Sequence, residues 1–162
     1  DRAAPMLEQV ARARQRLYGE GHVETASAYN NLGALEQARG RPEAAREHLQ
    51  RALRILTEAL GPEHPQLRSV CYSLGLVEHE LGHREQAIAS FERALALGKE
   101  ASDEQRGNIE LALATALWDD PAARERARLA AERALAAYER APHTNAERTQ
   151  ARQWLTEHPW PP

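Results

Sequence analysis

Cysteine is nearly absent from this sequence, since Cys71 is the only one. A single thiol cannot build an intrachain disulfide framework, and it leaves no thiol partner for a metal-binding knuckle. Cys71 lies in an apolar stretch, where a free cysteine behaves as a small buried hydrophobe. These features are typical of a reducing compartment, so we expect a cytoplasmic protein.

Long apolar runs and an excess of positive charge are also missing. No run approaches the ~20 apolar residues that cross a bilayer, and the first residues do not form a secretory signal peptide. The formal net charge is −3, and acidic and basic residues are interspersed along the chain. We therefore expect neither a membrane nor a nucleic-acid partner. Lys99 is the only lysine, a bias that, with abundant alanine, indicates a GC-rich bacterial genome.

The motifs of the common enzyme classes are not present. The glycines are isolated rather than grouped into a phosphate-binding loop, the serines lack a strand–turn–helix elbow, and no protein-kinase motif occurs. The carboxylate pair Asp119-Asp120 stands at a predicted helix end, where an N-cap explains it. We therefore expect a protein that is not an enzyme, with no catalytic residue and no cofactor.

What the sequence does contain is an internal repeat. A shift of 42 positions superposes many residues on identical ones, and glycine and histidine are too uncommon for such matches to recur by chance at one offset. The matching pairs are Gly19 with Gly61, His22 with His64, Leu32 with Leu74, Gly33 with Gly75, Gly40 with Gly82, Ala45 with Ala87, and the run 51–53 with 93–95.

Each repeat is predicted to form two antiparallel helices. Apolar residues recur at i, i+3, i+4 and i+7, and glycine or proline separates the stripes, as at Gly40-Arg41-Pro42 and Gly61-Pro62. No alternating strand pattern occurs, so these one-sided stripes can be buried only by pairing each helix with a neighbour. The predicted helices span 3–18, 23–39, 42–60, 65–81, 84–100, 103–118, 122–141 and 145–157.

The run Leu32-Gly33-(x6)-Gly40-(x4)-Ala45-(x3)-Leu49-(x2)-Ala52, with its copy from Leu74 to Ala94, resembles the tetratricopeptide repeat. The usual unit of that family has ~34 residues, whereas this unit has 42 and resembles the kinesin-light-chain type, which is common in bacterial regulators. The resemblance implies an all-α, right-handed superhelical solenoid. It also implies that the small residues let helices approach closely while Leu49 and Phe91 fill the core.

Outside the two clear repeats the pattern is weaker. A third unit lacks the Leu-Gly pair and begins with a predicted capping box of Ser102 and Gln105; a second box, Thr144 with Glu147, opens a last helix that caps the array. We expect one array over 1–162, made of a half repeat at 2–18, repeats at 22–61, 64–101 and 102–141, and a capping helix at 144–158.

In this architecture the first helix of each pair lines a concave groove, which in related arrays contacts extended peptides. We therefore expect a protein–protein interaction scaffold that binds a protein or peptide ligand there. Side-chain amides suit that ligand because each one both donates and accepts hydrogen bonds. The predicted groove residues are Ser27, Asn30, Asn31, Ala34 and Gln37, then Ser69, Tyr72, Ser73, Leu76 and His79, with Trp118 extending the surface.

Alternative functions follow from other features. Asn30 and Ala34 stand where the family's chaperone-tail clamp would have a lysine and an asparagine, so capture of a terminal carboxylate is not expected. The run Leu111–Trp118 resembles the tail array of bacterial Ser/Thr protein kinases, which implies a docking segment beside a kinase. A structural spacer that self-assembles is a further alternative.

The run His79-Glu80-Leu81-Gly82-His83 contains the His-Glu-x-x-His spacing of a zinc hydrolase. Gly82 repeats Gly40, so we expect the helix to end between the two histidines. The extended protease pattern is also broken, since Gln86 and Ala89 stand where glycine and histidine belong. We therefore expect no metal site, and we expect His83→Ala to leave stability unchanged.

The chain begins at Asp1 without a methionine, which indicates a piece of a longer protein. On the repeat register, helix 3–18 then lacks the helix that would cover part of Leu7, Val10 and Leu17. An exposed apolar stripe tends to find a partner, so we expect self-association through this end.

Overall fold

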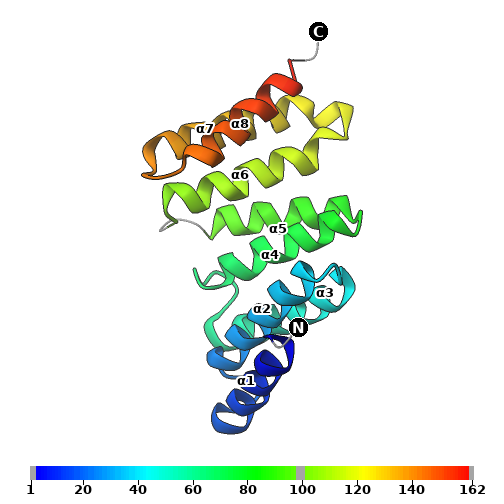
Figure 1. Cartoon of the computed structure of the whole chain (residues 1–162), viewed down its shortest axis with the longest axis vertical. Coiled ribbons are helices and arrows are strands. Elements are labelled where there is room, and N and C mark those ends of the chain that lie inside the picture. The colour runs from blue at the N-terminus through cyan, green and yellow to red at the C-terminus, as the bar shows by residue number, and fades with distance from the viewer. Residues whose placement is uncertain (1–2, 98–100, 161–162) are drawn as a thin grey trace.

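The computed structural model describes residues 3–97 and 101–160, which form eight α-helices and one short 3-10 helix. Each helix packs against the next one in the chain, so α1 and α8 lie at opposite ends of an elongated stack (Figure 1). The helices are α1 (Ala3–Tyr18), α2 (Val23–Ala38), α3 (Pro42–Leu60), α4 (Leu67–Glu80), α5 (Arg84–Ala96), α6 (Asp103–Trp118), η1 (Pro121–Ala123), α7 (Arg124–Arg140) and α8 (Asn145–Glu157).

The predicted all-α solenoid is confirmed, and most predicted helix ends are within two residues of the observed ones. Pro65 lies outside α4. It belongs to a tight turn that precedes this helix, in which the backbone N–H of Leu67 donates to the carbonyl of His64. Residues 98–100, predicted to end a helix, lie outside the described residues. No described helix is both long enough and apolar enough to cross a membrane.

The repeated glycines end helices in the left-handed backbone conformation. Gly40 and Gly82 have φ of 69° and 76°, which a residue with a Cβ adopts only with strain. At the joints between repeats, a histidine ring accepts a hydrogen bond from the backbone two residues later. The ring Nδ1 of His22 accepts from the N–H of Glu24, and that of His64 from the N–H of Gln66. His22 is thus the N-cap of α2, whereas His64 lies in the turn before α4, whose N-cap is Gln66.

Close helix packing within each repeat depends on a glycine that faces a large side chain. A Cβ on Gly33 would lie 2.6 Å from Cγ of Leu49, and one on Gly75 would collide with the ring of Phe91. Leu49 and Phe91 are 0% and 1% exposed, so the prediction that both are core residues is confirmed. Cys71 is buried as predicted, and burial raises the pKa of its thiol.

The third unit achieves the same close packing with different residues. Gly107 near the start of α6 faces Tyr138 near the end of α7, and a Cβ on Gly107 would lie 2.5 Å from the tyrosine ring. The glycine thus stands at the opposite end of its helix pair from Gly33 and Gly75. For this reason the Leu-Gly pair does not recur in the third unit at the repeat offset.

One of the two predicted capping boxes is present. Ser102 and Gln105 form the expected reciprocal pair at the start of α6. The box predicted at Thr144 is wrong, because the Thr144 hydroxyl donates to the carbonyls of Tyr138 and Ala141 instead of accepting from α8. This buried hydroxyl therefore joins the end of α7 to the start of α8.

Three carboxylates, one in each of α2, α4 and α6, are nearly buried. Glu36 pairs with Arg39 and Arg41, and Glu110 accepts two 2.9 Å hydrogen bonds from Arg133. Glu78 lies 2.7 Å from Nδ1 of His83. Because a buried carboxylate needs a partner, each of these pairs fixes the relative position of two segments.

Candidate binding groove

The first helices of the pairs, α2, α4 and α6, lie next to one another on one side of the stack. α4 contacts both α2 and α6, in addition to its contacts with the second helices α3 and α5. Two adjacent hollows open along this side, and α4 lines both of them. We call this side the inner face, and the two hollows together the groove.

The first hollow, between α2 and α4, has a volume of ≈ 440 Å³ and mostly polar walls. Its lining contains side-chain amides, hydroxyls, one guanidinium and one carboxylate, that of Glu24. We call it the polar hollow. The residues that line it are Val23, Glu24, Ser27, Asn30, Asn31, Leu56, Pro65, Gln66, Arg68, Ser69, Val70 and Gln105.

The second hollow, between α4 and α6, has a volume of ≈ 240 Å³, with walls formed largely by rings and aliphatic side chains. We call it the apolar hollow. Because α8 contributes one residue, the hollow is closed at one side by the capping helix. The residues that line it are Tyr72, Leu76, His79, Phe91, Asn108, Leu111, Ala112, Thr115, Tyr138 and Gln150.

The two hollows are offset from each other along the axis of α4. Ser69 lines the polar hollow and Leu76 the apolar one, seven residues further along the same helix. At 1.5 Å per residue that spacing is ~10 Å, which an extended peptide spans with about three residues. A segment that contacts both hollows must cover this offset and also cross α4, which lies between them.

Seven of the predicted groove residues line a hollow and four do not. Ser27, Asn30, Asn31 and Ser69 line the polar hollow, and Tyr72, Leu76 and His79 line the apolar one. Ala34 and Ser73 line neither. Gln37 also lies outside both hollows, where it donates a 3.4 Å hydrogen bond from α2 to Glu80 of α4.

Trp118 lies at the end of α6, away from both hollows, where it packs against the capping helix. Its ring meets Trp154 edge-on at 5.5 Å and His158 at 4.6 Å. Arg128 completes this end by donating to the backbone carbonyls of Leu155 and His158. The aromatic side chain of Trp118 therefore serves the α6–α8 contact in this structure.

Several lining residues were not predicted from the sequence. The first helix of the third unit, which lacks the Leu-Gly pair of the other repeats, contributes Gln105, Asn108 and Leu111. Tyr138 belongs to the second helix of that unit. Arg68 lies in the first turn of α4, where a charged residue resembles any solvated helix end. The Ser102–Gln105 capping box, which fixes where α6 begins, is the signal that identifies Gln105 and Asn108.

Two polar atoms in the lining of the polar hollow are buried and have no hydrogen-bond partner among the described residues. They are Oδ1 of Asn30 and Nη1 of Arg68. The other terminal nitrogen of Arg68 donates to Oε1 of Gln105 at 3.0 Å, which joins α4 to α6. Because neither atom is exposed to solvent, a ligand reaches them only if the side chains of Asn30 and Arg68 turn.

The two histidines of the His-Glu-x-x-His run point to different places. α4 ends at Glu80, and Gly82 turns the chain, so the helix ends between the two histidines as predicted. His79 lines the apolar hollow, whereas His83 contacts Glu78. Among the described residues, no group of three or more potential ligands is arranged to hold a metal ion.

The family of the chain follows from comparison with known proteins. The tetratricopeptide repeat model matches residues 1–58 and 24–100, which together are more than half of the chain. The chain belongs to the tetratricopeptide repeat family. A comparison with curated proteins gave no match.

Solved structures agree with the kinesin-light-chain type of repeat. The chain is similar to the putative kinesin light chain nearly identical TPR-like repeats of Podosopora anserina, with a TM-score of 0.73 and 21% identity. A crystal structure of a point variant of those repeats gives a TM-score of 0.75 at 20% identity. Each match covers 96% of this chain and 80% of the other, and at these identities it shows the fold alone.

Proposed function

We propose that this protein is a non-catalytic scaffold whose groove binds an extended peptide segment of a partner protein. The observation that carries the proposal is the pair of adjacent hollows on the inner face, one polar and one apolar, both lined by α4. A peptide suits this pair because it presents backbone donors and acceptors together with apolar side chains. The offset of the hollows along the axis of α4 is ~10 Å, the length of about three extended residues.

The chemistry of each hollow supports a peptide ligand. The polar hollow is lined by the side-chain amides of Asn30 and Asn31, a group that both donates and accepts hydrogen bonds as a peptide backbone does. In the apolar hollow, Tyr72 and Leu76 offer ring and aliphatic surface of a size suited to a single side chain. Tyr72 is an anchor of the kind that is enriched in interface hot spots.

The test begins with selection of binders from a phage-displayed library of random peptides on the immobilised 162-residue protein. The selected peptide is then titrated against the wild type, Asn30→Ala, Asn31→Ala and Tyr72→Ala. Each replacement should weaken binding by on the order of 1 kcal/mol or more, because it removes a hydrogen-bond partner or an anchor. Circular dichroism checks that the helices remain intact.

The control is Arg54→Glu, an exposed residue of α3 on the outer side of the array. This variant should bind the selected peptide like the wild type. If Arg54→Glu abolishes binding while the three groove variants bind normally, the partner uses the outer face. Failure of the library to yield any binder would also contradict the proposal.

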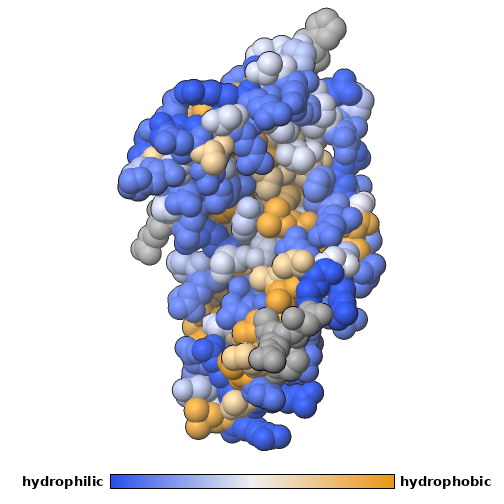
Figure 2. Space-filling view, viewed as in Figure 1, coloured by the Kyte–Doolittle hydropathy of each residue, from blue (hydrophilic) through white to orange (hydrophobic). Residues whose placement is uncertain are grey.

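A second candidate function, self-association through α1, rests on its exposed apolar side chains. Met6, Val10 and Leu17 are 64%, 41% and 73% exposed. Leu7, by contrast, packs on the core. Hydrophobic residues are visible at the α1 end of the molecule, whereas hydrophilic ones predominate toward α7 and α8 (Figure 2). Such a stripe favours association with another apolar surface.

The narrower expectations from the sequence remain proposals. We propose a cytoplasmic, bacterial protein with a signalling role, in which the array serves as a docking segment beside a Ser/Thr kinase. The run that suggested the kinase forms the second half of α6, where it packs in the core and against α8. The sequence of the complete gene tests this proposal, since a kinase motif beside the array would support it.

A further inference from the structure

Tyr138 reaches the apolar hollow from a helix that otherwise does not line the groove. It belongs to α7, the second helix of its pair, and its ring lies over Gly107 of α6. The side chain is 1% exposed, and its hydroxyl lies 2.8 Å from Oδ1 of Asn108. Because Gly107 has no Cβ, the ring can lie close enough to α6 for this hydrogen bond to form.

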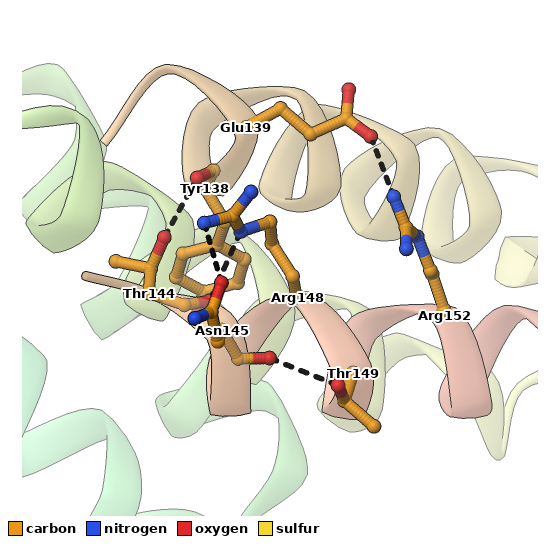
Figure 3. A network of polar contacts seen from close by, with 7 residues as sticks. All are labelled: Tyr138, Glu139, Thr144, Asn145, Arg148, Thr149 and Arg152. Carbon is orange, nitrogen blue, oxygen red and sulfur yellow. Dashed lines mark hydrogen bonds and ion pairs between the residues drawn. The ribbon is translucent and has the colours of Figure 1, made fainter. Parts of the chain in front are cut away.

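The junction between α7 and α8 holds Tyr138 in place. The buried hydroxyl of Thr144 donates a 2.7 Å hydrogen bond to the backbone carbonyl of Tyr138 (Figure 3). Within α8, Arg148 donates to the side-chain Oδ1 of Asn145, and the hydroxyl of Thr149 donates to the backbone carbonyl of Asn145 (Figure 3). The capping helix is thus tied to the residue that carries the ring.

The direction of the Tyr138–Asn108 hydrogen bond follows from what each group needs. The phenolic proton of Tyr138 has no other acceptor among the described residues, so the hydroxyl donates and Oδ1 of Asn108 accepts. Burial, the largest cause, and nearby Tyr72, Glu147 and Glu104 raise the pKa of Tyr138. The phenol therefore keeps its proton across neutral pH and remains a donor.

Because Oδ1 of Asn108 accepts from the tyrosine hydroxyl, the N–H₂ group is the part of the amide that remains to donate to a ligand. No carboxylate lines the apolar hollow, and its other polar side chains include His79 and Gln150. Its remaining walls are mostly apolar, with Leu76 and Leu111 among them. The hollow therefore matches a segment that carries an oxygen acceptor directly beside an apolar side chain.

We propose that Tyr138 is a positioning residue, which orients the amide of Asn108 so that the groove selects peptides with an oxygen acceptor next to an apolar side chain. The proposal rests on the groove binding a peptide. It assigns ligand selection in part to the third unit, at the point where the capping helix joins α7.

A double-mutant cycle with the phage-selected peptide tests this role. Tyr138→Phe keeps the ring and removes the hydroxyl, and it should weaken binding about three- to tenfold, as loss of one oriented hydrogen bond would. Asn108→Ala should weaken binding at least as much. In the Asn108→Ala protein, Tyr138→Phe should have no further effect, because the amide that it positions is gone.

Asn108→Asp replaces the N–H₂ donor that faces the ligand by a carboxylate acceptor. An aspartate accepts the tyrosine hydroxyl but presents an anionic oxygen to the hollow, so binding of the selected peptide should fall more than about tenfold. Renewed selection on this variant should replace acceptor residues by lysine or arginine. Selection of the same peptides as the wild type would overturn the proposal.

The outcomes separate this inference from the proposed function. If Asn31→Ala and Tyr72→Ala weaken binding while Tyr138→Phe has no effect, or adds fully to Asn108→Ala, the groove binds peptide but Tyr138 does not position Asn108. Nuclear magnetic resonance gives a readout without ligand. The side-chain amide signals of Asn108 should move in Tyr138→Phe, and unchanged signals would overturn the inference even if no peptide were selected.

Discussion

At the scale of single residues, three glycines determine how closely the helices of a pair approach. Gly33, Gly75 and Gly107 each face a large side chain at a distance that leaves no room for a Cβ. Glycine inside a helix normally costs about 0.5–1 kcal/mol relative to alanine. The repeat accepts that cost because Leu49, Phe91 and Tyr138 then pack directly on the helix backbone.

This packing predicts whether one substitution raises or lowers the free energy of unfolding. Gly75→Ala should lower the free energy of unfolding by about 1–3 kcal/mol, since the new methyl group overlaps the ring of Phe91. In a Phe91→Ala background the same change should instead be neutral or stabilising. Urea denaturation of the four proteins measures both effects, and a stabilising Gly75→Ala in the wild type would contradict the packing.

The buried phenol of Tyr138 predicts a pH dependence at the alkaline side. Burial raises its pKa in the folded protein above the ordinary value of 10.0, so the folded state holds the proton more tightly than the unfolded state. This contribution to stability is present below pH about 10 and is lost as the pH rises above that value. Tyr138→Phe should therefore lose less stability than the wild type between pH about 9 and about 11, and parallel urea midpoints would contradict this.

At the scale of helices, two side chains carry much of the packing within the repeats. Leu49→Ala and Phe91→Ala should each cost roughly 2–5 kcal/mol, because each leaves a cavity against the facing glycine. Glu47→Ala, at an exposed position of α3, is the matched control and should change the urea midpoint little. Equal midpoints for all the variants would show that the helix pairing is different.

The turn between α4 and α5 changes one expectation from the sequence. His83→Ala was expected to leave stability unchanged, but the structure places its Nδ1 2.7 Å from the buried carboxylate of Glu78. We now expect a loss of about 1–2 kcal/mol, because a buried acceptor would lose its partner. Thermal or urea unfolding at neutral pH measures it, with Glu85→Ala, an exposed residue in the first turn of α5, as the control.

At the scale of the whole molecule, the two ends of the array differ. α8 buries only Ala151 of its own residues and turns polar side chains such as Gln153 and Glu157 outward, whereas α1 exposes Met6, Val10 and Leu17. Growth of the array by end-to-end contact is therefore favoured at α1 and disfavoured at α8.

This asymmetry predicts a concentration-dependent association. The mean mass from light scattering should rise with protein concentration, and Leu17→Lys should return it toward that of the monomer. Leu129→Lys, which replaces an exposed leucine of α7, should have no such effect. A constant monomer mass for the wild type at high concentration would rule out the association.

The sequence by itself determined the repeat, the helices and the core of the first two units. The 42-residue period, the turn glycines, and Leu49 and Phe91 are local signals, because helix periodicity and turn conformation depend on residues close in the chain. The same signals placed Asn30, Asn31 and Tyr72 on the inner face. They also showed that the helix ends between His79 and His83.

Only the tertiary structure decided which residues meet across units. Arg68 with Gln105, and Tyr138 with Asn108, come from different helices and follow no repeat offset. Trp118 was expected in the groove, but it packs on α8 because the aromatic residues of the capping helix lie next to it. Periodicity shows which face of a helix is apolar; the packing of neighbouring helices decides what that face contacts, and in the third unit Gly107 leaves room for Tyr138 against α6.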